Sequence, residues 1–259
     1  MKSSASLLLA FLMFAVALAF GQSTFGTFVG TVQDQSGSVI AAAVVTITNL
    51  DDNSVRSATT NSSGQYQLLN IPPGRYSISV IKSGFANAKV DQVTLDARQE
   101  RRVDVTLSLA SVQQSVQVNA EAANINTENA TIANTMGNDE VTGLPSNYRG
   151  ASTSPLGAIV ASANVSQDQY GNISLTGSQP FQTDYTVDGT STVNIVYNSP
   201  ASNMYPSSEM LSEFKVSAIN NNAEFATTGD VTVTTKSGGN VLHGSAFEYL
   251  QNRALDATT

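Results

Sequence analysis

Residues 25–109 alternate between apolar and polar side chains in short runs, and turn-forming residues interrupt the alternation about every ten residues. Successive side chains of a strand point to opposite faces, so this pattern predicts short strands with one packed and one solvated face. The clearest runs are GRYSISV at 74–80 and VDVTLSL at 103–109, and weaker ones cover 27–32, 43–49, 64–69 and 90–95. Turn signals at 34–37, 61–64, 72–74 and 82–84 lie between them. The spacing predicts an antiparallel β-sandwich of about seven strands.

The composition supports β-structure and argues against several kinds of chemistry. Charged residues make up 12% of the 259 residues, and the 18 glycines and many Ser, Thr and Asn residues favour strands and loops over helices. A net charge of −8 argues against a nucleic-acid partner, because phosphate binding needs basic patches. The sequence contains no cysteine, so disulfides and thiolate catalysis are excluded.

The N-terminal segment predicts export. Lys2 precedes an uninterrupted apolar run, LLLAFLMFAVALAF at 7–20, and small residues surround its end. A run of about 14 residues is shorter than the roughly 20 that span a bilayer, so we expect a secretory signal peptide over residues 1–21 and no membrane anchor. An exported chain without cysteine fits a bacterial envelope protein.

One stretch of the first block resembles a known domain. TTNSSGQYQLLNIPPGRYSISVIKSGF, residues 59–85, resembles the carboxypeptidase regulatory-like domain, a transthyretin-type β-sandwich. In such a sandwich we expect Tyr66 and Tyr76 to bury their rings while their hydroxyl groups find partners at its edge. The resemblance implies no peptidase activity.

The second block resembles the plug domains of TonB-dependent outer-membrane receptors. VTGLPSNYRG at 141–150 resembles their Leu-Pro-x-Asn-x-Arg element, although Tyr148 stands where glycine is commoner. DYTVDGTS at 184–191 resembles the strand and turn that end in Asp-Gly. Residues 208–257 resemble the corresponding series of Oar-like receptors, in which a regulatory-like sandwich precedes a plug and a large transmembrane barrel. The motif residues are Leu144, Pro145, Asn147, Arg149, Asp188 and Gly189.

Together the two resemblances predict a mainly β chain with five parts. A signal peptide (1–21) precedes a transthyretin-like antiparallel β-sandwich (22–110), a linker (111–124), a mixed α+β plug domain (125–240) and the first strand of a missing β-barrel (241–259). A barrel strand needs about 9–11 residues, and the aromatic-bearing stretch 241–250 has that length. We therefore expect a fragment or truncated product that lacks its barrel.

The resemblance also implies a partner. SVQQSVQVNA at 111–120 occupies the position of the Ton box, which pairs as an added strand with the energy-coupling protein TonB. Val116, Gln117 and Val118 are the residues expected to make this contact, and Arg149 is expected to face acidic groups of the barrel wall. The alternative for 111–120 is an ordinary linker or plug strand, because short alternation is common.

Catalytic and metal-binding constellations are missing from the sequence. The single histidine, His243, has no cysteine or second histidine with which to hold a metal, and it lacks the nucleophile elbow of a serine hydrolase. Asp34, Asp51 and Asp52 lie at turns without calcium-loop spacing, so we expect them to cap backbone amides. We predict no cofactor and no enzyme activity.

Two functions remain after this reading. The first is the periplasmic sandwich and plug of a TonB-dependent receptor in the outer membrane of a Gram-negative-type bacterium, taking up an unidentified ligand. The alternative is a secreted adhesive or carbohydrate-binding β-sandwich protein. An adhesin usually repeats its sandwich, and the Gly-x-Tyr pattern does not recur after residue 110.

Overall fold

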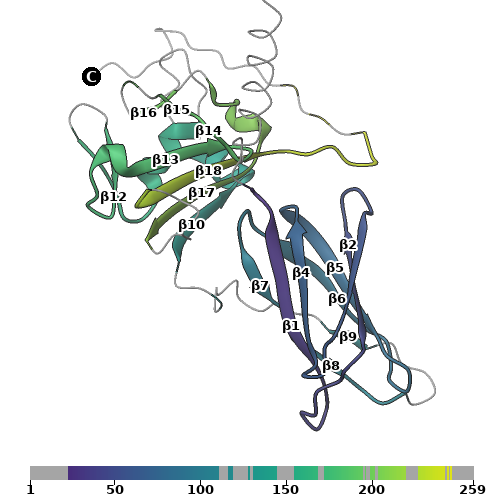
Figure 1. The fold of residues 1–259 in the computed structure, drawn as a ribbon. Coiled ribbons are helices and arrows are strands. Elements are labelled where there is room, and N and C mark those ends of the chain that lie inside the picture. Colours follow the sequence, from purple (N-terminus) through teal and green to yellow (C-terminus); the bar gives the residue numbers. More distant parts are fainter. Residues whose placement is uncertain are drawn as a thin grey trace, which may run out of the picture.

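Two β-rich domains make up the chain in a computed structural model, and each has its own hydrophobic core (Figure 1). The structure describes residues 23–110, 116–118, 128, 131–144, 155–168, 172–194, 196, 199–201, 204–219, 227–242, 244 and 246. The predicted signal peptide and most of the predicted linker lie outside these residues. Among the described residues, no helix has the length and apolarity to cross a membrane.

The first domain is a sandwich of two sheets. One sheet has the order β4-β1-β7, with β8 also paired to β1, and the other has the order β3-β2-β5-β6-β9. The strands of the first sheet are β1 (Gly26–Asp34), β4 (Gln65–Ile71), β7 (Glu100–Arg102) and β8 (Val105–Leu107). Those of the second are β2 (Val44–Asn49), β3 (Val55–Thr59), β5 (Gly74–Ile81), β6 (Ala88–Leu95) and β9 (Val116–Val118).

The core of the sandwich confirms the predicted alternation. Tyr76, Ile78 and Val80 of β5 are at most 2% exposed. The Tyr76 ring meets Phe28 of the opposite sheet edge-on, with centroids 5.5 Å apart, a geometry that contributes about 1 kcal/mol beyond burial. The hydroxyl groups find partners as expected, because Tyr66 donates to the Val103 carbonyl at 2.7 Å and Tyr76 to the Pro72 carbonyl at 2.7 Å.

The sandwich departs from the prediction in its strands and in their directions. Strand β3 was not predicted, because every residue from Val55 to Thr59 is exposed or half-buried and shows no apolar alternation. The stretch 103–109 is not one strand. The Asp104 side chain accepts a hydrogen bond from the Thr31 amide at 2.7 Å, and residues 103–104 separate β7 from β8.

The prediction of a purely antiparallel sandwich is wrong for three pairs. Strands β7 and β8 pair with β1 in parallel, and β9 pairs with β6 in parallel. The cause is the crossing of the chain from one sheet to the other. The turn after β6 carries the chain across to β1, which it then follows in the same direction.

The second domain is built on a mixed five-stranded sheet with the order β10-β17-β18-β13-β14. Its strands are β10 (Ile132–Gly137), β13 (Thr183–Val187), β14 (Thr190–Ser191), β17 (Leu211–Ile219) and β18 (Gly229–Thr235). Two small two-stranded sheets, β11 (Val165–Gln167) with β12 (Ile173–Leu175) and β15 (Val193–Asn194) with β16 (Ser199–Pro200), accompany it. The described helical elements are α2 (Asn138–Gly143) and the 3-10 turns η1 (Pro155–Ala161), η2 (Pro180–Gln182) and η4 (Ser208–Met210).

The central strands of this sheet carry two different faces. Phe214, Val216, Val231 and Val233 are at most 1% exposed and pack into the second core with Val141 of α2 and Ile159 of η1. The alternate residues Glu213, Lys215, Asp230 and Thr232 form a polar face that is nevertheless buried, with exposures of 1–9%. The polar face of these strands can be buried only if another part of the protein covers it and binds its polar groups.

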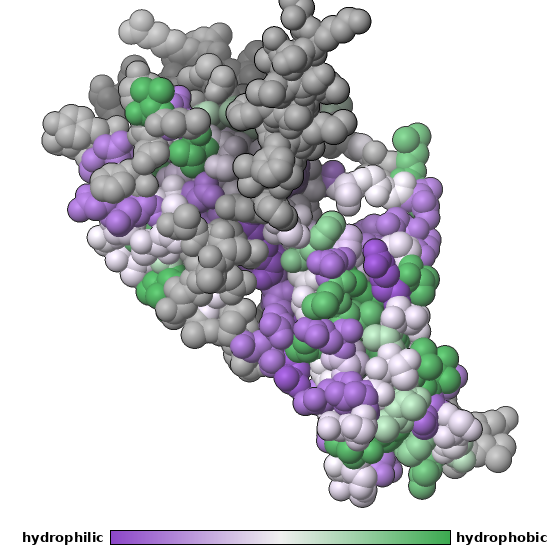
Figure 2. Space-filling model, in the orientation of Figure 1, coloured by the Kyte–Doolittle hydropathy of each residue, from purple (hydrophilic) through white to green (hydrophobic). Residues whose placement is uncertain are grey.

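The stretch expected to begin the barrel is not a strand at its described positions. Val241 is 75% exposed and Leu242 is fully exposed, so neither packs into a core. Residues 243, 245 and 247–250 lie outside the described residues. On the face shown in Figure 2, apolar and hydrophilic residues are interspersed over the sandwich and do not gather into one large apolar patch.

Candidate functional site

Residues Val116–Val118 lie at an edge of the sandwich. They form β9, which pairs with β6 in the register Ala88↔Val116, Lys89↔Gln117 and Val90↔Val118. β9 is the last strand in its sheet, and no described strand lies on its outer side. An edge strand keeps unpaired backbone groups that can accept a further strand. The site therefore has the main-chain geometry that strand addition needs.

The chain reverses direction to place β9 there. The Ala86 amide donates to the Ser108 carbonyl at 2.8 Å and the Ala110 amide to the Gly84 carbonyl at 3.1 Å, so the chain runs antiparallel to residues 84–86 at this point. It returns as β9 parallel to β6. The ladder is three residues long, and each of its hydrogen bonds contributes about 1 kcal/mol, so the segment is held weakly.

The Leu-Pro-x-Asn-x-Arg element is described only at its first residue. Leu144 caps the C-terminal end of α2, and its amide donates to the Val141 carbonyl at 3.4 Å. Its side chain is half-buried against the second core. Pro145, Asn147 and Arg149 lie outside the described residues, as does His243.

Asp188 and Gly189 form the two-residue turn between β13 and β14. Both have positive φ, 48° and 80°, which is the backbone of a type I′ hairpin turn and explains the Asp-Gly pair. The Asp188 carboxylate accepts hydrogen bonds from the amide and the hydroxyl of Thr235, both at 2.9 Å. The turn is thereby attached to the end of β18, a structural role for this carboxylate.

The two domains meet at a buried polar joint that sequence reasoning missed. The turn Asp96–Gln99, between β6 and β7 of the sandwich, lies on the polar face of the five-stranded sheet in the second domain. The Ala97 amide donates to Glu213 Oε2 at 2.9 Å, and Lys215 Nζ donates to the Ala97 carbonyl at 2.6 Å. Both strand residues belong to β17. The backbone of one domain therefore binds an acid and a base of the other.

An ion pair completes the joint. Arg98 Nη1 lies 2.8 Å from Asp230 Oδ2, and the two side chains are 7% and 2% exposed. The same nitrogen donates to Thr232 Oγ1 at 3.0 Å, and Nη2 donates to Thr186 Oγ1 at 3.5 Å. Arg98 has a φ of 57°, a left-handed backbone that is uncommon for arginine. A buried pair with one partner removed leaves an uncompensated charge, so these contacts are strongly interdependent.

Burial shifts the ionisation of this joint. Desolvation raises the pKa of Glu213 to about 7, and the nearby charge of Asp96 adds to the rise. Desolvation also raises the pKa of Asp230 in spite of Arg98, and raises that of Asp96. The pKa of Lys215 is lowered by the same desolvation. One oxygen of Asp230, Oδ1, has no hydrogen-bond partner among the described residues.

The sequence held a signal for one side of this joint only. The alternation in SEFKVS places Glu213 and Lys215 on one strand face, opposite Phe214 and Val216. Nothing in that pattern says that the polar face is covered. The Ala97–Arg98 turn carries no motif.

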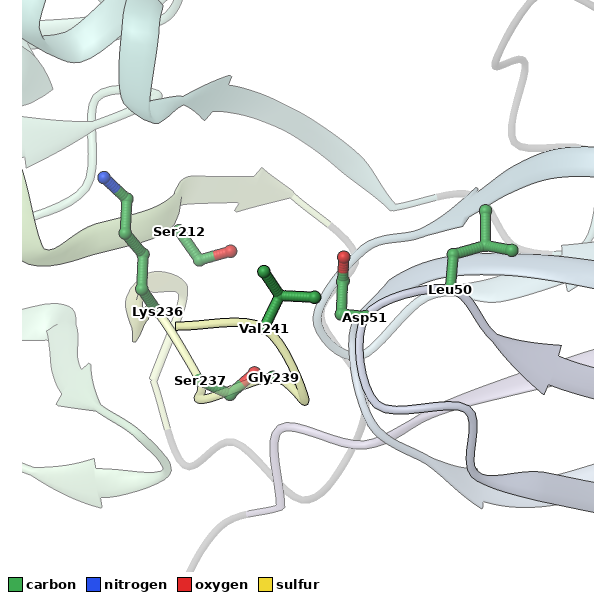
Figure 3. A pocket seen from close by; sticks show the side chains of 7 residues that line it. All are labelled: Leu50, Asp51, Ser212, Lys236, Ser237, Gly239 and Val241. Atoms are coloured by element: carbon green, nitrogen blue, oxygen red, sulfur yellow. The ribbon is translucent and has the colours of Figure 1, made fainter. Parts of the chain in front are cut away.

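A second, more exposed contact joins the domains beside a cleft of about 310 Å³ (Figure 3). The Asn240 side chain donates to the Asp52 carbonyl at 2.6 Å, which brings the segment after β18 against the β2–β3 loop. The cleft is lined by Leu50, Asp51, Ser212, Lys236, Ser237, Gly239 and Val241. In Figure 3 the Lys236 side chain points away from Asp51, so the cleft does not gather opposite charges on one ligand position.

The predicted capping of backbone amides is confirmed for Asp34 and Asp52, whereas the Asp51 carboxylate accepts a hydrogen bond from Arg75 Nη2 at 2.7 Å. Asp34 Oδ1 accepts hydrogen bonds from the Ser36 amide at 2.8 Å and the Ser38 amide at 2.9 Å, and Asp52 accepts from the Ser54 amide at 2.7 Å. Across the described residues, no group of three or more His, Cys, Asp or Glu side chains is arranged to hold a metal ion.

Comparison with known proteins finds a family match for the first domain and one similar curated protein for most of the chain. The carboxypeptidase regulatory-like domain family matches residues 27–108. The TonB-dependent transporter Oar of Myxococcus xanthus is 26% identical over 254 aligned residues, which cover 94% of this chain and 24% of that protein. The chain thus spans about a quarter of the length of this curated relative.

Solved structures align with about a third of the chain at low similarity. The Bacillus anthracis TIE protein has a TM-score of 0.30 with 19% identity, and the alignment covers 33% of this chain and 17% of that one. A 3-chlorocatechol 1,2-dioxygenase from Rhodococcus opacus has a TM-score of 0.28 with 13% identity, over 36% of this chain and 62% of that one. A streptococcal ancillary pilin has a TM-score of 0.28 with 14% identity, over 33% of each chain. Scores this low carry no functional information.

Proposed function

Because the chain is an Oar-like relative of the TonB-dependent receptors and carries a carboxypeptidase regulatory-like domain, we propose that it supplies the periplasmic sandwich and the plug of such a receptor. The intact receptor would take up a ligand through an outer-membrane barrel. The signal peptide predicted over residues 1–21 and the kinship with a transporter both support export to the periplasm and outer membrane. The role is binding and transport, with no catalytic step.

The extent of the similarity is the observation that carries this proposal. An alignment over 94% of the chain cannot be confined to residues 27–108, so it includes the second domain as well. A sandwich alone occurs in proteins of many functions, and fold by itself does not imply function. A sandwich followed by a related second domain is a much narrower match.

The coupling contact is proposed at β9. TonB would add a strand to Val116–Val118, using main-chain hydrogen bonds that depend little on side chains. The chain after β9 leads into β10, one of the two edge strands of the five-stranded sheet in the second domain. A pull on β9 would therefore act first on β10. Arg149 is proposed to face acidic groups of the barrel wall, and Asp188–Gly189 to shape a turn near the ligand side.

The adhesive or carbohydrate-binding alternative gains no support from the fold. The second described domain is a mixed sheet with helical elements and a separate core, whereas an adhesin usually repeats its sandwich. None of the described residues that line the cleft between the domains is aromatic, and sugar-binding sites use aromatic side chains for stacking.

Disulfide cross-linking to TonB tests the proposal. Because the chain has no cysteine, an introduced cysteine is its single thiol and the site of any adduct is known. Gln117→Cys in the full chain is combined with a set of single-cysteine variants of the TonB periplasmic domain. The matched control is Ser57→Cys, an exposed residue on β3 at the opposite edge of the same sheet. We expect oxidised adducts with Gln117→Cys at several neighbouring TonB positions. Equal yields from Ser57→Cys would refute the coupling role.

A further inference from the structure

The turn Asp96–Gln99 of the sandwich contacts three adjacent strands of the five-stranded sheet in the second domain. Ala97 binds Glu213 and Lys215 of β17 through its backbone. Arg98 binds Asp230 and Thr232 of β18 and reaches Thr186 of β13. The turn therefore holds β17, β18 and β13 together from their polar face.

Strand β10 stands apart from this group. It is an edge strand that pairs with β17 alone, in a register from Ile132↔Ile219 to Gly137↔Glu213. Among its residues only Met136 is buried. It is also the first strand after the coupling segment in the sequence.

From this arrangement we propose that the sandwich acts as a clamp on the second domain. The Asp96–Gln99 turn keeps β17, β18 and β13 folded, so that a pull on Val116–Val118 detaches β10 and leaves the other three strands in place. The proposal rests on the proposed function for the origin of the pull, although the clamp itself is a property of this chain.

Strand β10 is held by fewer buried contacts than the strands that the turn Asp96–Gln99 binds. Detaching β10 breaks one ladder at a sheet edge and exposes one large apolar side chain, Met136. Separating β18 from the turn exposes an ion pair that is nearly completely buried, and removal of either partner leaves a buried charge. The edge strand is therefore the weaker element, and the clamp widens the difference.

Hydrogen exchange measured strand by strand tests the clamp on the full chain without TonB. The double substitution Asn134→Pro and Thr135→Pro imitates the pulled state, because one of two consecutive prolines removes whichever amide faces β17. We expect the amides of β17, β18 and β13 to stay protected in this variant while β10 exchanges freely. The protection of the sandwich strands serves as an internal measure of folding.

Removing the clamp from the proline variant gives the second arm. Addition of Arg98→Ala should accelerate exchange in β17, β18 and β13 by at least about a hundredfold. A further variant combines Arg98→Ala with Asp230→Asn, which removes the ion pair without leaving a buried charge, and it should show the same direction of change. The matched control is Arg56→Ala, an exposed arginine of β3, which should change nothing.

Each outcome decides the proposal. Protection that is lost from β17, β18 and β13 with the prolines alone would overturn it, because β10 could then not leave by itself. Protection that survives both Arg98 variants would overturn it too, because the turn would not be the clamp. If TonB does not cross-link but the exchange pattern is as expected, the proposed source of the pull is wrong and the clamp still holds. Failure of the proposed function and failure of the clamp are therefore distinguishable.

Discussion

At the scale of single residues, Gly30 of β1 lies where no side chain fits. A Cβ at this position would lie 2.0 Å from the Val103 carbonyl oxygen and 2.8 Å from a ring carbon of Tyr66. We expect Gly30→Ala to lower the free energy of unfolding of the sandwich by about 3 kcal/mol, because the backbone of the neighbouring segment must move. Urea unfolding of the full chain, followed by a sandwich probe, measures the change.

The control for Gly30→Ala is Gly157→Ala, where nothing lies within 4 Å of the added atom. That substitution should change the urea midpoint little. An unchanged midpoint for Gly30→Ala would show that β1 and the Val103 segment are not packed as closely as described.

The burial of some single residues could be predicted from the sequence, and that of others could not. The burial of Tyr66 and Tyr76 and the partners of their hydroxyl groups were predictable, because a large ring with one polar atom has few places in a small sandwich. The burial of Glu213 and Asp230 was not predictable. A charged residue in an alternating strand normally faces water, and only the docking of a second domain changes that.

At the scale of elements, the turn of the hairpin β13–β14 adds the Asp188 side-chain contacts to the end of β18, next to the parallel ladder that joins β13 to β18. We expect Asp188→Ala to speed hydrogen exchange at the end of β18, because the Thr235 amide and hydroxyl lose their acceptor. The loss should be about 1–2 kcal/mol of local protection. Thr190→Ala, an exposed residue in the same hairpin, is the control, and equal effects of the two would contradict the role given to Asp188.

Most sandwich strands were predictable as elements, but their pairing was only partly so. Strands with one buried face, such as β5, carry the alternation that predicts them. The edge strand β3 lacks it, because neither of its faces is buried enough to select apolar residues. Parallel pairing of β7 and β8 with β1 depends on where the chain crosses between sheets, which no local pattern encodes.

At the scale of the whole molecule, the order of the two blocks was readable, whereas their contact was not. The boundary was predicted from a loss of alternation after Leu109, and β9 at Val116–Val118, beyond that point, still pairs within the sandwich. The joint, in contrast, pairs an unremarkable turn with a polar strand face more than a hundred residues away. Such long-range pairs need the assembled fold.

Docking of the two domains should weaken as the pH rises. Glu213 is buried in the joint, its pKa is raised from 4.5 to about 7, and separation of the domains would return it to water. A group with a raised pKa stabilises the docked form fully below pH 4.5 and loses that contribution as the pH rises through about 7. Between these two pH limits the contribution of Glu213 to the free energy of docking changes by about 3 kcal/mol.

The other charges at the joint set the background for this change. Asp96 and Asp230 also have raised pKa values, so they act in the same direction, while Lys215 has a lowered pKa and acts in the opposite one. The contribution of Glu213 to docking changes between pH 4.5 and about 7, so the response is measured across that window.

Spin labels on Ser57→Cys in the sandwich and Ser166→Cys in the second domain measure docking directly. We expect one narrow distance distribution at pH 5 and a broader one at pH 8, since separated domains on a linker sample many distances. Glu213→Gln should flatten this pH dependence, because an amide cannot titrate. Glu140→Gln, an exposed acid of α2, should leave it intact. A full pH response in Glu213→Gln would assign the titration to Asp96 or Asp230, the remaining acids of the joint.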